Sequence, residues 1–271
     1  MTASGTNTAA AGQWRAALGE WAIPPEILAA APEPPWAFSP AMFARRAEQV
    51  VVDIADTPSR RRAVEALPEG GSVLDVGVGG GAACLPLVPP AALLVGVDDG
   101  DGMLAAFAAG ADRLGVAHRE IQGTWPAVAS EVDAADVVVS HHVLYNIADL
   151  VPFAAALTSH ARHRVVVEIS ADHPTANLSP LWLAIHGIVR PTSPTADDAI
   201  AVFRDMGLDV SHEEATAQWQ HLGADRADMV AMMRRRLCVG PERDAEIDAA
   251  LGTAIEAPLR RNVTIWWEGT A

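Results

Sequence analysis

The sequence contains no lysine: its 19 basic residues are all arginines, and 34 acidic residues bring the formal net charge to −15. A chain this acidic, without a basic tail, is a poor partner for nucleic acid or an anionic membrane surface. Its two cysteines, Cys84 and Cys238, have no spacing typical of a metal site or a disulfide framework. No apolar run approaches the roughly 18 residues of a membrane-spanning helix. These absences argue against nucleic acid and membranes as partners.

The first residues, MTASGTNTAAAGQ, have neither the basic nor the apolar region of a signal peptide, which predicts a cytoplasmic location. Residues 1–12 are small and polar and predict a disordered tail. Proline-interrupted helical segments over residues 13–56 predict a helical cap. The remainder, residues 57–271, is expected to form the main domain, and Thr57 and Pro58 mark the start of its first helix.

From residue 72 onward, short apolar runs alternate with helical patterns, including a helix expected directly after the glycine-rich turn. Continuous apolar strands separated by helices are typical of a parallel sheet covered on both faces. The pattern therefore predicts a doubly wound α/β fold. The five predicted strands are SVLDVGV, LLVGVDD, AHREIQG, ADVVVS and RVVVEIS.

After Ser170 the alternation is looser. Residues around 171–200 and 222–255 are predicted to be lid or substrate insertions, and Thr195 is expected to cap a helix. The last run, NVTIWWEGT, predicts a strand, in which Trp266 and Trp267 must point to opposite faces.

The turn that follows the first strand, Asp75 to Ala82, reads DVGVGGGA. From Gly77 it fits G-x-G-x-x-A, a form of the dinucleotide fingerprint, and from Asp75 it fits D-x-G-x-G-x-G. Glycines suit a dinucleotide and S-adenosylmethionine alike, because both cofactors lie against bare backbone. Asp75 favours S-adenosylmethionine, since a carboxylate repels the pyrophosphate of a dinucleotide and attracts the ammonium and sulfonium groups of S-adenosylmethionine. Asp98, about 20 residues further on, suits the ribose of either cofactor.

In order and spacing, the segments VLDVGVGGG, LLVGVDDGDGMLAAF, ADVVVSHHVLYNIADL and RVVVEIS resemble the motifs of class I S-adenosylmethionine-dependent methyltransferases. The resemblance covers roughly residues 57–170 and implies a mostly parallel seven-stranded sheet with a final antiparallel strand. It also implies a cofactor site. The methionine part of the cofactor would be held by Asp75, Gly77, Gly79 and Gly81, and the ribose by Asp98. Near the adenine would lie Asp99 and Met103, and the sulfonium would be bordered by Ser140 and His141.

One position departs from the family pattern. The family often has Gly-Asp after the third strand, with the acid accepting a hydrogen bond from the adenine amino group, whereas this chain has Gly123-Thr124-Trp125. Adenine recognition would then rest on Thr124, backbone groups and packing against Trp125. The alternative that Trp125 is a core residue is left open.

Methyl transfer needs alignment and, for a hydroxyl acceptor, often a base. Ligands of parallel sheets sit at the carboxyl ends of the strands, which singles out His141, His142 and His173 as catalytic candidates and Tyr145 as a pocket wall. No metal is predicted, because Asp136 lies at the wrong end of its strand and Asp149 is expected to cap a helix.

The sequence thus predicts a methyltransferase for a small-molecule acceptor, with O-methylation favoured. One rival is an NAD-dependent oxidoreductase, against which Asp75 and the absence of a Tyr-x-x-x-Lys pair argue. A second rival is a non-catalytic protein that binds S-adenosylmethionine. A homodimer is left open.

Overall fold

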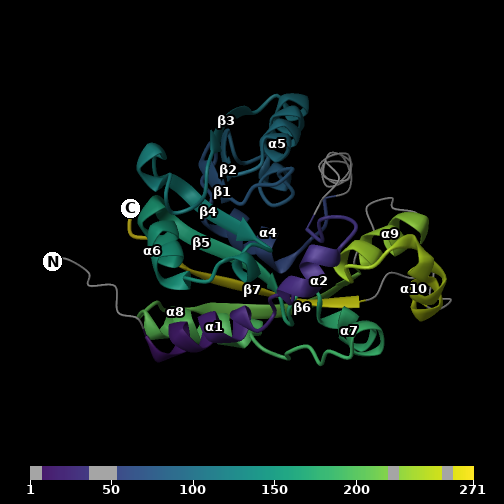
Figure 1. Cartoon of the computed structure of the whole chain (residues 1–271). Coiled ribbons are helices and arrows are strands. Elements are labelled where there is room, and N and C mark those ends of the chain that lie inside the picture. The colour runs from purple at the N-terminus through teal and green to yellow at the C-terminus, as the bar shows by residue number, and fades with distance from the viewer. Residues whose placement is uncertain (1–7, 37–53, 219–225, 252–258) are drawn as a thin grey trace.

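The computed structural model describes residues 8–36, 54–218, 226–251 and 259–271. These residues form one seven-stranded sheet in the order β3-β2-β1-β4-β5-β7-β6 (Figure 1). All neighbouring strands are parallel except β7, which runs antiparallel to both β5 and β6. The predicted fold is confirmed. The strands are β1 (Ser72–Val76), β2 (Leu93–Asp98), β3 (Ala117–Gln122), β4 (Ala135–His141), β5 (Ala161–Ser170), β6 (Ser211–Gln218) and β7 (Leu259–Glu268).

Helices cover both faces of the sheet (Figure 1). Val137 and Val139 of β4 point to the face that carries α4 (Pro58–Ala66) and α5 (Asp101–Leu114), whereas Val138 points to the opposite face. As predicted, Trp266 and Trp267 of β7 also pack on opposite faces. The helices on the second face are α1 (Ala9–Gly19), α6 (Leu150–His160) and α8 (Ala196–Asp205).

Two of the three helix caps expected from the sequence form in the structure. The hydroxyl of Thr57 accepts a hydrogen bond from the Arg60 amide at 3.2 Å, and Pro58 occupies the first turn of α4. Thr195 and Asp198 form a capping box at the start of α8. Asp149 stands at the N-cap position of α6, but its side chain makes no capping bond and instead pairs with Arg15 at 3.3 Å.

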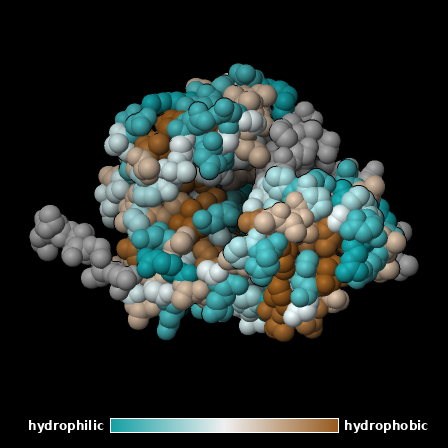
Figure 2. Space-filling model, in the orientation of Figure 1, coloured by the Kyte–Doolittle hydropathy of each residue, from teal (hydrophilic) through white to brown (hydrophobic). Residues whose placement is uncertain are grey.

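Four further helices pack around a small core of their own, and we call this group the side lobe: α2 (Pro25–Ala30), α7 (Ser179–His186), α9 (Arg226–Arg236) and α10 (Asp244–Ala250). Trp182, Leu237 and Ile247 are buried at its centre. In Figure 2, hydrophobic residues gather on its lower surface near α7, where Leu183 and Val189 are exposed. None of the helices in the described part of the chain is long and apolar enough to cross a membrane.

The structure corrects two sequence predictions. The predicted tail of residues 1–12 is wrong for residues 9–12, which belong to α1; residues 1–7 lie outside the described part, as do residues 37–53 of the predicted cap. The helix forms because alanine favours it, Thr8 caps it with a 3.2 Å bond to Ala11, and Trp14 anchors it in the core, donating to the Ile147 carbonyl at 2.8 Å.

The second correction concerns the helix expected after the glycine-rich turn. Only one 3-10 turn, Leu85–Leu87, stands there. The prolines at positions 86, 89 and 90 explain the difference, because each lacks the backbone N–H that a continuing α-helix would need. The chain consequently crosses to β2 by turns.

Candidate functional site

The loop after β1 is shaped by three glycines in left-handed conformations. Gly77, Gly79 and Gly81 have φ angles of 76°, 51° and 85°. A side chain at Gly77 would begin only 2.3 Å from a methyl group of Val143. The loop is fastened to β2, since the amides of Gly77 and Val78 donate to the Val97 carbonyl at 2.8 and 3.0 Å. Only glycine suits these positions, which leaves a bare backbone for a ligand to approach.

Asp98, at the end of β2, joins this loop to the next. Its two carboxylate oxygens accept hydrogen bonds from the amides of Gly79 at 2.9 Å and Gly100 at 3.0 Å. Asp99 is exposed beside it, and Met103, in the first turn of α5, is half-buried. The structure therefore brings together the residues that the sequence assigned to the ribose and to the surroundings of the adenine.

Asp75 lies beneath the glycine loop, 1 % exposed, and within the described part of the chain neither of its carboxylate oxygens has a hydrogen-bond partner of ordinary geometry. Burial raises its pKa to about 7; the thiol of Cys84 opposes this rise, and the negative charge of Asp98 adds to it. A ligand that brings positive charge relieves an unpaired buried carboxylate, whereas a pyrophosphate would add a further negative charge. The donor set thus fits the ammonium and sulfonium of S-adenosylmethionine.

Two other predicted cofactor residues have structural contacts of their own. Trp125 is 7 % exposed, donates from its indole to the Phe153 carbonyl at 3.3 Å and meets His160 edge-on. These contacts support the alternative that Trp125 is a core residue. Ser140 is fully buried and donates to the Val76 carbonyl at 2.8 Å, which ties the end of β4 to the start of the glycine loop. Thr124, by contrast, is exposed and lies one residue beyond Gly123, which follows β3.

The residue that follows β4, His142, has an unusual backbone and a buried acidic partner. Its φ is 59°, a conformation uncommon outside glycine. Its amide donates to the Glu168 carbonyl at 2.7 Å, and its Nε2 lies 3.2 Å from a Glu168 carboxylate oxygen. The other oxygen of Glu168 accepts from the Ser59 hydroxyl at 2.7 Å. The imidazole is thereby held at the end of β4 while 35 % of its side chain stays exposed.

The charge state of Glu168 follows from these contacts. Burial alone would raise its pKa, but the hydrogen bond from His142, the charges of His141 and His142 and the Ser59 hydroxyl outweigh burial and lower it to about 2. Glu168 is therefore ionised at neutral pH and can only accept hydrogen bonds. The position of this carboxylate, 3.2 Å from Nε2 of His142, favours the tautomer with the proton on Nε2, and in that tautomer Nδ1 carries the free lone pair.

The other candidates occupy less favourable positions. His141 is the last residue of β4 and is half-buried. His173 is stacked on Trp21 at 3.8 Å, and burial together with the positive charges of Arg190 and Arg236 lowers its pKa to about 4. Such a ring is neutral at pH 7 but weakly basic. Tyr145 donates to the Ser170 carbonyl at 2.9 Å, and burial raises its pKa, which argues against a role as a base.

Sequence reasoning missed Glu168 and Ser59. Glu168 did carry a signal, because it is the one charged residue within the otherwise apolar run VVVEIS of β5. Ser59 carried none, since a serine in the first turn of a helix is commonplace. Among the described residues, no group of three or more histidine, cysteine, aspartate and glutamate side chains could hold a metal ion.

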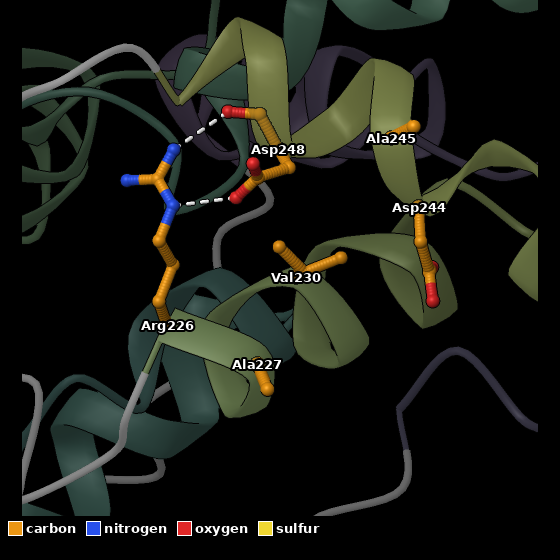
Figure 3. A pocket seen from close by; sticks show the side chains of 6 residues that line it. All are labelled: Arg226, Ala227, Val230, Asp244, Ala245 and Asp248. Carbon is orange, nitrogen blue, oxygen red and sulfur yellow. Dashed lines mark hydrogen bonds and ion pairs between the residues drawn. The ribbon is translucent and has the colours of Figure 1, made fainter.

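A surface hollow of about 380 Å³ lies elsewhere, between α9 and α10 (Figure 3). Arg226 pairs with Asp248 across it. All its lining residues come from these two helices, and none comes from a strand end or the glycine loop. The hollow is therefore separate from the site described above.

Residues 74–164 match the sequence family described as a methyltransferase domain. No curated protein matches the chain in sequence. Similar solved structures include YcgJ from Bacillus subtilis (16 % identity, TM-score 0.52, 79 % of this chain and 98 % of that one) and YjhP from E. coli (17 %, 0.51, 84 % and 99 %). An S-adenosylmethionine-dependent methyltransferase from Thiobacillus denitrificans, in complex with S-adenosyl-L-homocysteine, is also similar (21 %, 0.48, 82 % and 98 %). At these identities the first two structures establish the fold.

Proposed function

We propose, from the premise that residues 74–164 form a class I S-adenosylmethionine-dependent methyltransferase domain, that this enzyme methylates a hydroxyl group of a small molecule at the carboxyl ends of β4 and β5. The cofactor, when bound, supplies an electrophilic methyl group on a sulfonium. The glycine loop and Asp98 would hold it, and Asp75 beneath the loop would favour its positive charge. The residues of this chain would align the acceptor with the methyl group and remove its proton.

The observation that carries the proposal is the His142–Glu168 pair at 3.2 Å. With Nε2 committed to Glu168, Nδ1 of His142 would take the proton from the acceptor hydroxyl as its oxygen attacks the methyl group. The ionised Glu168 would stabilise the imidazolium that forms, and Ser59 would keep the carboxylate in place. The left-handed backbone of His142 fits this role, because strained positions cluster at functional sites.

A small acceptor is favoured over a macromolecule by the net charge of −15, which disfavours nucleic acid. The fold and the charges around Asp75 do not favour an NAD-dependent oxidoreductase. A non-catalytic protein that binds S-adenosylmethionine would retain the glycine loop but would gain nothing from a histidine held by a buried glutamate.

The test is transfer of labelled methyl groups from S-adenosylmethionine to a panel of hydroxyl, amine and thiol metabolites. We expect turnover with a hydroxyl acceptor and a loss of about 10²–10⁴-fold in His142→Ala. His212→Ala, at an exposed histidine of β6, is the matched control and should keep full activity. Transfer only to amines or thiols, or full activity of His142→Ala, would overturn the proposed mechanism.

A further inference from the structure

The antiparallel strand β7 brings one polar side chain to the acidic partner of His142. Asn262, near the start of β7, pairs with Ser170, the last residue of β5. It therefore lies at the carboxyl end of β5, the edge at which parallel sheets bind ligands. Glu168 precedes Ser170 by two residues and so shares a face of the sheet with Asn262. Across this face, Nδ2 of Asn262 donates to Oε1 of Glu168 at 3.3 Å.

This contact falls on the same carboxylate oxygen that faces the histidine. Oε1 of Glu168 lies 3.3 Å from Nδ2 of Asn262 and 3.2 Å from Nε2 of His142. The two nitrogens are therefore at most 6.5 Å apart, the sum of these distances. Oε2 accepts from the Ser59 hydroxyl at 2.7 Å. With donors on both oxygens, the carboxylate cannot turn about its last bond without lengthening a hydrogen bond.

The charge of Glu168 decides which way the Asn262 amide points. An ionised carboxylate only accepts hydrogen bonds, so the NH2 group of the amide faces it. The carbonyl oxygen Oδ1 then lies on the other side of the amide, where it is buried without a hydrogen-bond partner among the described residues.

Asn262 is therefore an unfavourable residue for the fold at its own position. A buried carbonyl that lacks a donor lowers the free energy of unfolding, and asparagine is depleted in strands in general. Residues that cost stability in this way are typical of functional sites, where they hold other groups in place. The group that Asn262 holds is the carboxylate of Glu168.

We propose that Asn262 is a positioning residue for the base: its amide keeps the Glu168 carboxylate turned toward His142, and thereby keeps the neutral imidazole in the tautomer whose Nδ1 is free to take the acceptor proton. This inference rests on the proposed function. Asn262 acts only through Glu168 and has no contact with the reacting atoms in this role. The competing explanation is that Asn262 serves folding alone.

The first experiment measures the tautomers of His142 by nitrogen NMR of the full chain with labelled histidine, in the pH range where the spectra show a neutral ring. The spectrum of His142→Ala assigns the signals. Wild type should favour the tautomer with the proton on Nε2. Asn262→Leu, which has nearly the same shape and no donor, should lower the ratio of the two tautomers by about fivefold, the loss expected for one hydrogen bond.

A matched control lies on the same strand. Thr264 is buried, pairs directly with Glu168 and faces the same side of β7 as Asn262. Thr264→Val also removes a polar group from this face, and it should leave the tautomer ratio within twofold of wild type. Asn262→Val repeats the test with a smaller side chain that suits a strand. A ratio within twofold of wild type in both variants of Asn262, or an equal change in Thr264→Val, would overturn the inference.

Stability separates positioning from folding. In urea, Asn262→Leu should unfold at a midpoint no lower than that of wild type, because it removes the buried carbonyl while Glu168 keeps His142 and Ser59 as partners. A lower midpoint together with an unchanged tautomer ratio would assign Asn262 to folding alone. With a hydroxyl acceptor, Asn262→Leu should lower kcat by about fivefold and leave KM within twofold, since the lost hydrogen bond supports the imidazolium formed during transfer.

The inference and the proposed function fail in different ways. Full activity of His142→Ala would overturn the proposed function, whatever Asn262 does. An unchanged tautomer ratio in the Asn262 variants, with activity lost in His142→Ala, would overturn only the role of Asn262. The tautomer measurement needs no acceptor, so it decides the role of Asn262 in either case.

Discussion

Replacing Asp75 by asparagine should stabilise the protein at alkaline pH, because the contacts of the buried carboxylate with the described residues do not offset its charge. Its pKa is raised from 3.8 to about 7. Folding therefore takes up a proton between these two pH values, and the free energy of unfolding falls as pH rises through this window. The raised pKa of Asp75 lowers the free energy of unfolding by about 4 kcal/mol at pH 8 and by about 1.5 kcal/mol at pH 5. Asparagine has nearly the same shape and no charge at either pH.

The assay is urea denaturation of wild type and Asp75→Asn at pH 5 and pH 8. We expect the stability gained by the variant to be larger at pH 8 by about 3 kcal/mol. Asp99→Asn, at an exposed aspartate near the same loop, is the matched control and should show no such difference. A gain that is the same at both pH values, or a loss at pH 8, would refute the account of Asp75.

The same carboxylate should make cofactor binding depend on pH. Once ionised, Asp75 attracts the ammonium of S-adenosyl-L-homocysteine, so the affinity of wild type should rise as pH passes through about 7. Asp75→Asn should bind more weakly at pH 8 and show no rise. Calorimetric titrations between pH 5.5 and 8.5 measure both, and a flat wild-type profile would contradict this role.

Three further predictions concern the loop, the base and the N-terminal helix. Gly79→Val should abolish binding of S-adenosyl-L-homocysteine while the chain stays folded, because a branched residue at a φ of 51° distorts the local backbone of the glycine loop. Calorimetry and circular dichroism test this, and wild-type affinity would show that the loop is misassigned. Glu168→Gln should lower kcat by about tenfold or more and shift the acidic limb of its pH profile, with little change in cofactor affinity, because His142 loses its ionic partner; an unchanged profile would leave Glu168 a purely structural role. Trp14→Ala should destabilise the fold by about 3–5 kcal/mol in urea denaturation, since it empties a fully buried site that ties α1 to Ile147, and a loss below about 1 kcal/mol would show that α1 is loosely attached.

Much of the fold followed from the sequence because its signals are local. Apolar β-branched runs separated by helical patterns indicate a parallel sheet covered on both faces, independently of distant parts of the chain. Thr57 and Thr195 cap their helices through hydrogen bonds to residues only three positions away. The glycine loop was equally local, since positive φ angles at Gly77, Gly79 and Gly81 leave few alternatives to glycine. The prolines after this loop also indicate that no helix forms there, but the repeating strand–helix pattern led to the prediction of one.

The site depended on contacts between residues far apart in the sequence. Glu168 meets His142 and Ser59 only because β4 and β5 are neighbours and α4 crosses their face, and Ser59 precedes Glu168 by 109 residues. The burial of Asp75, and the contact of Asn262 with the Glu168 carboxylate, depend in the same way on how distant segments pack. The sequence by itself determined most of the secondary structure and the bare backbone of the glycine loop, because the energies that decide them act between neighbouring residues. Only the tertiary structure decided which charges are buried and which are paired, because the electrostatic energy of a group depends on everything that surrounds it in space.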